Sequence, residues 1–393
     1  MEQSAASSAS STSSSRFNIK QHMELPETYK CAVTEIVVGE GGFHKVFRYD
    51  MKLLVQYSAC ATLFTKGTVF TMDKTALKIT GAMLMLLVFT ASITLLLSMR
   101  NLKALLTLDI AAMKALAHHA NSVLRFVLAM FISVSLTRWW ALRVTALGKV
   151  FDALANTCMI VATELHDAKW WEVRNCVMKY GMASIELLVQ AARDSDEIET
   201  LCEQDMDLLT ETEVEFMREH EILWQRPMVI WAWIMHVITD AMDQEKVPTP
   251  SRQAVIHQCL NARDGMAAIN MFLDTQLPFA YVHLITLLVN VQNVLTAVKA
   301  GMVFATAVVQ GNSFVMVQQV FSTAIIVFIY QAVLAIACVV EDPFGDDVLD
   351  FPIRAYKAYV ASIVDAMMGA GRGCPAVSSD GRMRRPIMTV KSI

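Results

Sequence analysis

A cluster of acidic side chains follows a long apolar run near the end of the chain. Four Asp and one Glu stand within the ten residues from Glu341 to Asp350, directly after Phe314 to Val340, which carries no charge. Carboxylate oxygens are the ligands that calcium takes. Pro343 and Gly345 bend the backbone, so that carboxylates can converge on one point. The pattern fits a calcium site, and a solvated acidic turn after a helix is the alternative interpretation.

A second candidate site lies in the middle of an earlier apolar segment. Ser122, Phe126 and Met130 are spaced four residues apart and therefore share one face of a helix. If that face lined a pore, its apolar side chains would form a constriction that gates by dewetting. Ordinary packing against a neighbouring helix is the alternative.

The same segment ends in Arg138, Trp139 and Trp140. An Arg at the end of a membrane span is costly unless it reaches the interface or finds a partner. Two adjacent Trp residues are typical of the membrane interface. These three residues therefore predict a structural anchor.

Other kinds of chemistry find no support in the sequence. The chain has no nucleophile elbow, no His-Glu-x-x-His, no Walker motif and no pair of catalytic carboxylates, so we do not expect an enzyme. The net charge of −4 gives no indication of nucleic-acid binding. The eight Cys are scattered without metal-ligand spacing, which favours reduced thiols.

The composition identifies the elements that must position these residues. The chain is 55% hydrophobic and 18% charged, with a mean hydropathy of +0.42. Soluble domains contain less apolar and more charged sequence, so we predict an all-α integral membrane protein. The excess lies in five blocks: Ile79 to Met99, Ser122 to Trp140, Met228 to Thr239, Leu277 to Val298, and Phe314 to Val340. The short third block suits a buried or partly inserted helix better than a lipid-facing span.

The remaining segments divide the chain into three parts. Residues 1–45 form a Ser-rich tail that we expect to be disordered, residues 46–370 form the main domain, and residues 371–393 form a flexible tail. The region from Asp194 to Glu221 is strongly acidic and must lie in water. Within it, Thr210 and Glu213 predict a helix-capping box. No alternation of apolar and polar residues is strong enough to support a sheet.

Four of these motifs, in this order along the chain, resemble the bestrophin family of anion channels over roughly residues 50–370. Phe126 with Arg138-Trp139-Trp140 is similar to the family's neck helix and its Arg-Trp-Trp ending. Leu209-Thr210 with the acids after it resembles a helix-start signature, and Leu277-Pro278 with Tyr281 resembles the family's Ile-Pro-Leu-Val-Tyr. The run from Asp342 to Asp347, followed by Asp350, looks like the family's Asn-Pro-Phe-Gly-acidic calcium clasp.

The resemblance implies a homopentamer around one central pore, with four membrane-associated helices per subunit, an extended cytosolic helical region and both termini in the cytosol. Its neck would be lined by Ser122, Phe126 and Met130, of which Ser122 is polar and Met130 replaces an aromatic residue. Its calcium ligands would be the main-chain oxygen of Val339 and three carboxylates, those of Asp342, Asp347 and Asp350. Asp342 stands where the family usually has Asn.

The function implied is an anion channel that passes chloride, with bicarbonate as a second candidate anion, and that calcium regulates. Its partners would be further copies of itself, membrane lipid and inorganic anions. A non-conducting membrane scaffold with the same fold is the alternative. The motifs fit a plasma-membrane protein and an organellar one, such as a thylakoid protein, equally well.

Overall fold

Helices build almost the whole of the described chain. The computed structural model describes residues 33–37, 45–49, 74–99, 110–202, 207–345 and 350–370. Its elements are β1 (Val33–Val37), β2 (Lys45–Tyr49), α3 (Lys74–Met99), α5 (Ile110–Ala141), the π-helix η2 (Leu142–Leu147), α6 (Gly148–Glu164), η3 (Ala168–Trp170), α7 (Trp171–Ala192), η4 (Ile198–Cys202), α8 (Glu211–Arg218), η5 (Leu223–Gln225), α9 (Arg226–Gln244), α10 (Thr249–Asp274), α11 (Phe279–Val309), α12 (Ser313–Glu341) and α13 (Ile353–Ala370).

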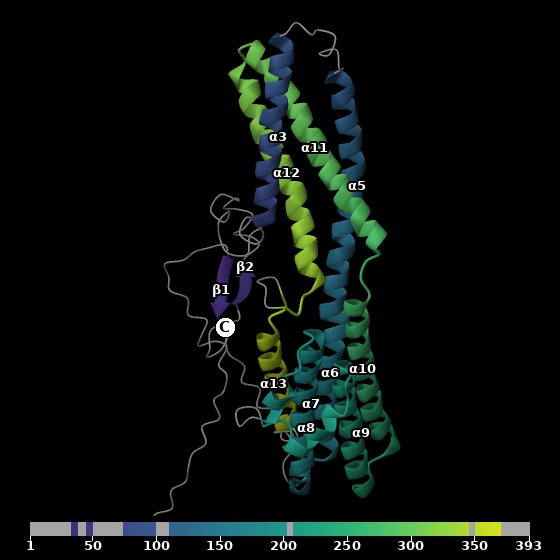
Figure 1. The fold of residues 1–393 in the computed structure, drawn as a ribbon. Helices are drawn as coiled ribbons and strands as arrows, with labels where there is room; N and C mark the ends of the chain where they lie inside the picture. The colour runs from purple at the N-terminus through teal and green to yellow at the C-terminus, as the bar shows by residue number, and fades with distance from the viewer. Residues whose placement is uncertain are drawn as a thin grey trace, which may run out of the picture.

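The helices divide into two groups along one axis (Figure 1). Helices α3, α5, α11 and α12 form one group, here called the span bundle, and α6 to α10 with α13 form the other, here called the helical base. Each helix of the span bundle is long and apolar enough to cross a membrane, and α9 is not among such helices. Helix α9 buries Ile230, Trp231, Ile234 and Ile238, as expected if the block Met228 to Thr239 is a buried helix.

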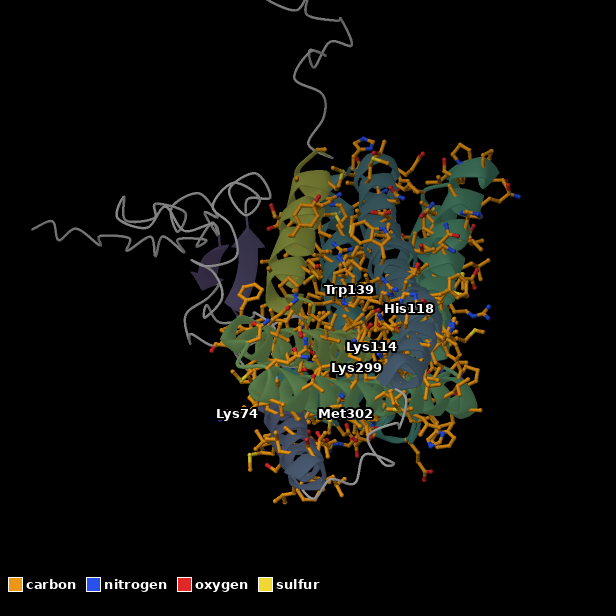
Figure 2. The ribbon with its side chains drawn as sticks, turned by 90° about the horizontal axis from the view of Figure 1, so that it is seen from above. Lys74, Lys114, His118, Trp139, Lys299 and Met302 are labelled. Atoms are coloured by element: carbon orange, nitrogen blue, oxygen red, sulfur yellow. The ribbon has the colours of Figure 1, made fainter. Side chains whose placement is uncertain are left out.

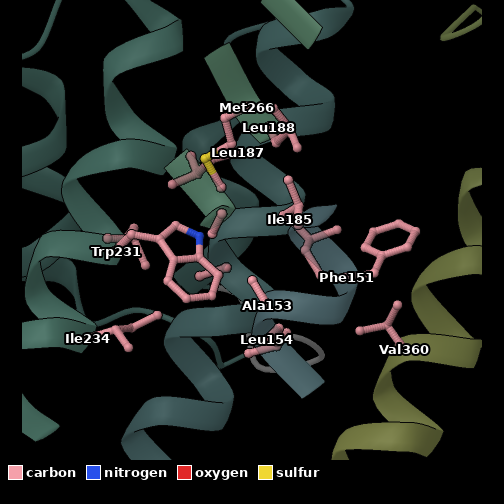
Figure 3. Close-up of a cluster of buried hydrophobic side chains, with 14 of the residues drawn as sticks. Phe151, Ala153, Leu154, Ile185, Leu187, Leu188, Trp231, Ile234, Met266 and Val360 are labelled. Atoms are coloured by element: carbon pink, nitrogen blue, oxygen red, sulfur yellow. The ribbon is translucent and has the colours of Figure 1, made fainter. Parts of the chain in front are cut away.

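The helical base has its own apolar core, drawn in Figure 3. Trp231 of α9 is 2% exposed and donates its indole N–H to the buried Ser184 hydroxyl of α7 at 2.7 Å. Leu154 of α6 fills the space beside Gly181, where a Cβ would lie 2.1 Å from a Leu154 methyl carbon. This close packing makes the helical base a rigid support for the span bundle.

One continuous helical segment joins the two groups. Helix α5 runs through the π-helix η2 into α6 without a break. A Cβ on Gly265 of α10 would lie 2.9 Å from the carbonyl oxygen of Ala146, so α10 packs directly against the π-helical backbone. Arg143, within the same π-helix, stacks over the Tyr356 ring of α13 at 4.1 Å. The base thus holds the lower end of α5 from two sides.

A two-stranded antiparallel sheet is an element that the sequence analysis did not predict. Strand β1 pairs with β2, with Val33 opposite Tyr49 and Val37 opposite Lys45. The prediction of no sheet was wrong for these ten residues, and β1 lies inside the segment 1–45 that we expected to be disordered. Neither strand alternates apolar and polar residues: Thr34 and Glu35 are consecutive polar residues in β1, and Val46 and Phe47 are consecutive apolar residues in β2.

Smaller features follow the sequence closely. The capping box at α8 is confirmed: the Thr210 hydroxyl accepts from the Glu213 backbone N–H, and the Glu213 carboxylate accepts from the Thr210 backbone N–H. Helix α13 follows the acidic loop and runs from Ile353 to Ala370.

The packing of α3 against α11 gives a first prediction. A Cβ on Gly301 would lie 1.9 Å from the Thr90 hydroxyl oxygen and 2.7 Å from the Leu87 carbonyl oxygen. We expect Gly301→Ala to force the two helices apart and to destabilise the protein by about 1–3 kcal/mol, the usual range for overpacking. Thermal unfolding of the purified protein measures this. Gly81→Ala is the control, because a Cβ at Gly81 meets nothing within 4 Å; equal melting temperatures for the two variants would refute the prediction.

Candidate functional site

Helix α5 has one face that packs within the subunit. Leu124, Leu128, Phe131 and Ser135 are each less than 9% exposed. The three apolar ones form a core cluster with Ile285 and Val289 of α11 and with Tyr330 and Ala337 of α12. Tyr281, part of the predicted Leu277-Pro278 motif, joins this cluster by an edge contact with Phe131 at 6.1 Å. One stripe of α5 is therefore fully used in holding the span bundle together.

The predicted neck residues lie on the opposite side of α5. Phe126 is two residues from both Leu124 and Leu128, which places it about 200° around the helix from each. Phe126 is 68% exposed and Met130 is 49% exposed, and Ser122 is exposed as well. The Ser122 hydroxyl donates to the His118 carbonyl at 3.1 Å, so its proton is bonded to the backbone of its own helix. The three side chains share a face that the packing within the subunit leaves open.

The charges carried by the span bundle are almost all basic. Helices α3, α5 and α11 contain no acidic residue, and α12 has only Glu341 at its end. Gln292 of α11 donates to the Ala117 carbonyl of α5 at 3.4 Å, which sets the register of the two helices. In projection along the bundle, Lys114 and His118 of α5 appear beside Lys299 of α11 (Figure 2). Lys114, Arg125, Arg138 and Lys299 give α5 and α11 basic side chains without an acidic residue in either helix.

The Arg-Trp-Trp sequence makes tertiary contacts. Arg138 continues the packed stripe of α5 and donates from Nη2 to the carbonyl oxygens of Phe272 at 2.9 Å and Thr275 at 2.6 Å. These carbonyls belong to the end of α10, where carbonyls lack partners within the helix. Arg138 thus caps the end of α10. Trp139 packs on the ring of Phe351 at 5.1 Å, and Trp140 is 63% exposed.

The described residues of the acidic cluster, 341–345 and 350, lie between α12 and α13. The Asp342 carboxylate accepts from the Phe344 backbone N–H at 3.4 Å, and the Phe351 backbone N–H donates to the Pro343 carbonyl at 2.8 Å. Phe344 is completely buried, and its ring meets that of Phe351 edge-on at 5.6 Å. Two buried rings therefore anchor the two sides of the loop to the base.

The described part of the loop has oxygens suited to calcium. Around the position that a Cβ on Gly345 would take, the Asp350 Oδ2 lies at 2.8 Å and the Asp342 carbonyl oxygen at 4.0 Å. The main-chain oxygen of Val339 belongs to the last turn of α12, and the residue four positions on is Pro343, which has no N–H to donate to it. Hard oxygen ligands of this kind fit calcium.

The full ligand set is not within the described residues. Asp347 lies outside them, as do the three residues around it. Among the side chains that the structure does describe, no group of three or more His, Cys, Asp or Glu is arranged to hold a metal ion. Asp342, Asp350 and Val339 are thus the part of the predicted site that can be placed on the fold.

The crowding at Gly345 gives a prediction for this loop. We expect Gly345→Ala to leave the fold intact, because the atom it meets is the end of the Asp350 side chain, but to displace that carboxylate. Calcium affinity should fall by about tenfold or more, the consequence of about 1.4 kcal/mol of lost ligand interaction. Isothermal titration with calcium measures this. Gly369→Ala, whose Cβ would meet nothing within 4 Å, is the control, and equal affinities in the two variants would contradict the prediction.

Sequence reasoning missed the residues that support the loop from far away in the chain. Arg193 of the turn after α7 and Trp139 of α5 contact the loop across more than 150 positions. Trp139 was identified only as an anchor, and Arg193 carried no signal, since a single Arg at a helix end is common. Only the fold brings these residues together.

The comparisons with known proteins agree with this geometry. The family model described as "Bestrophin, RFP-TM, chloride channel" matches residues 25–356. Two crystal structures of variants of a bacterial bestrophin homologue from Klebsiella pneumoniae are 16% and 17% identical to the chain, with TM-scores of 0.61 and 0.62. The matches cover 74% and 76% of this chain and 99% of each of those chains. At this level of identity the structures show a shared fold.

A comparison with curated protein sequences finds no significant match. The family match covers most of the chain and includes all four helices of the span bundle, and the chain therefore belongs to the bestrophin family of membrane proteins.

Proposed function

We propose that this protein is an anion channel that passes chloride, with bicarbonate as a second permeant anion. The observation that carries the proposal is the open face of α5, where Ser122, Phe126 and Met130 lie opposite the stripe that packs within the subunit. Helix α5 has apolar side chains both on its packed stripe and on its open face. The open face therefore needs a further neighbour or surrounding beyond the helices of its own subunit. The description of the family as chloride channels favours a pore as that environment.

The proposed pore is formed by five copies of the chain around one axis, with the open face of each α5 turned inward. An apolar neck holds anions weakly and lets large, poorly hydrated anions pass more easily than strongly hydrated cations. Basic residues at the Lys114 end of α5, together with the absence of acidic residues from α5, raise the local concentration of anions.

Calcium is the proposed regulator. Asp342, Asp347 and Asp350 would supply carboxylate oxygens and Val339 a main-chain oxygen, which together neutralise and orient a bound calcium ion. The loop contacts Trp139 at the lower end of α5 through Phe351. A change in the loop would therefore reach the helix that carries the neck.

Met130 stands where the resemblance places an aromatic residue, and this difference gives a prediction about conductance. We expect Met130→Phe to narrow the neck and to lower the unitary conductance by about twofold or more, since a rigid ring replaces a flexible thioether at the constriction. Single-channel recording measures it. Unchanged conductance and unchanged calcium dependence would show that Met130 does not line the neck.

Recording in planar bilayers with a chloride gradient tests the proposed function itself. A reversal potential near the chloride equilibrium potential, from protein shown to be pentameric, is the expected result. A reversal potential near that of the cation would refute anion selectivity. Silent bilayers with the same pentameric protein would favour the scaffold.

A further inference from the structure

His119 lies in line with the proposed neck along α5, nearer the end at which that helix begins. It stands seven residues before Phe126, which places it two turns away, about 10 Å along the axis, and rotated from Phe126 by only about 20°. The line along α5 through these two residues is here called the neck line. The His119 side chain is exposed, as are those of Ser122 and Phe126. The open face of α5 therefore carries an imidazole directly before the apolar neck.

The other basic side chains of α5 point elsewhere. Lys114, Arg125 and Arg138 are rotated away from the neck line by about 100–120°, and His118 is rotated by about 80°. The helix contains no further ionisable residue between Ile110 and Ala141. His119 is thus the ionisable side chain of α5 that lies in line with the neck.

The helices around His119 supply no acidic partner for its protonated form. Helices α5 and α11 contain no Asp or Glu, and the acidic residue of α12, Glu341, lies at the far end of that helix. The charged groups toward the His119 end are basic: Lys114 of α5 appears beside Lys299 of α11 in Figure 2. Among the described residues, the His119 ring meets the His118 ring at 6.0 Å and has no ion pair. A permeant anion would therefore be the natural counter-charge for a proton on His119.

We propose that His119 forms an anion-binding ring at the entrance of the neck, which holds a small monovalent anion such as chloride when the imidazoles are protonated. The inference rests on the proposed pore, in which every subunit turns this face of α5 inward. Rings of basic side chains favour anions in pores. Imidazole is the side chain whose charge changes between about pH 5 and pH 8. An anion held by this ring stands immediately before the apolar constriction, so protonation raises the rate at which anions enter the neck.

Chloride conductance of the full-length protein, recorded with saturating calcium at about pH 8 and about pH 6, tests the proposal. Ordinary carboxylates stay ionised over this range. We expect the wild-type conductance to be about threefold or more higher at the lower pH. His119→Gln should lose this response, and His119→Lys should conduct at both pH values as the wild type does at the lower one. His118→Gln is the matched control, because it removes a neighbouring imidazole that points about 100° away from His119, and it should respond as the wild type does.

Each outcome of these recordings decides the proposal. A His119→Gln channel that keeps the wild-type response to pH would overturn it, and so would a His118→Gln channel that loses the response. Equal wild-type conductance at the two pH values would overturn it as well. If the Gln variant does not fold, a pH response that persists in His119→Lys would place the titrating group elsewhere. Wild-type protein that passes no chloride at either pH would contradict the proposed pore itself, whereas conductance that does not depend on His119 would contradict the ring alone.

Discussion

Replacing Phe344 with Ala is expected to destabilise the protein by about 3–5 kcal/mol, the usual cost of emptying a buried aromatic site. The Phe344 side chain is 0% exposed and packs edge-on against Phe351, whose ring contacts both Trp139 and Tyr356. Removing it leaves a cavity at the point where the loop, α5 and α13 meet. Because Asp342 and Asp350 lie on either side of this anchor, calcium binding should be lost together with stability.

Thermal unfolding in detergent, with and without calcium, measures both effects. Wild-type protein should melt at a higher temperature when calcium is added, since a ligand that binds only the folded state stabilises it. Phe344→Ala should melt lower and should not respond to calcium. Phe279→Ala is the control, because that side chain is 81% exposed at the start of α11. A Phe344→Ala variant as stable as this control would show that the loop is not anchored by its ring.

Removing the Phe126 ring is expected to change conduction more than any other single substitution in α5. Phe126 stands between Ser122 and Met130 on the open face and has the largest side chain of the three. With Ala at this position the proposed neck would be wide enough to stay wetted, so that the dewetting barrier would be lost. We expect chloride flux to rise by an order of magnitude in the absence of calcium, and calcium dependence to disappear.

The control for this variant must be an exposed Phe of another membrane-length helix. Phe321 of α12 is 64% exposed, close to the 68% of Phe126, but α12 does not carry the proposed neck. Phe321→Ala should conduct as the wild type does. Equal flux and equal calcium dependence in the two variants would place the neck elsewhere.

The membrane-length helices could be predicted from the sequence because their signal is long and uninterrupted. The block Phe314 to Val340 became α12 with one residue added at each end, and Ile79 to Met99 became α3 with five added before it. The block Ser122 to Trp140 was underestimated, because α5 begins at Ile110 and continues through η2 into α6. Lys114 and the two His residues interrupt its apolar pattern, yet a helix accepts them without difficulty.

The candidate site was predicted only as far as local motifs reach. The spacing of Ser122, Phe126 and Met130 gave a common face, but the same pattern fits core packing. The fold was needed to show that a different stripe does the packing. In the same way, the acidic residues from Glu341 to Asp350 suggested a calcium loop. They gave no indication of which distant residues contact that loop. The bracing by Arg193 and the capping of α10 by Arg138 join distant segments, and no local pattern encodes such contacts.

Chloride efflux from liposomes that contain the purified protein tests the central claim most directly. Free calcium is buffered high or chelated, and wild type is compared with Asp347→Ala. A calcium-regulated anion channel predicts efflux that requires calcium in the wild type and is lost in the Asp347→Ala variant. Efflux that ignores calcium in both would keep the channel and remove the regulation. No efflux under either condition, from protein shown to be pentameric, would contradict the proposed function.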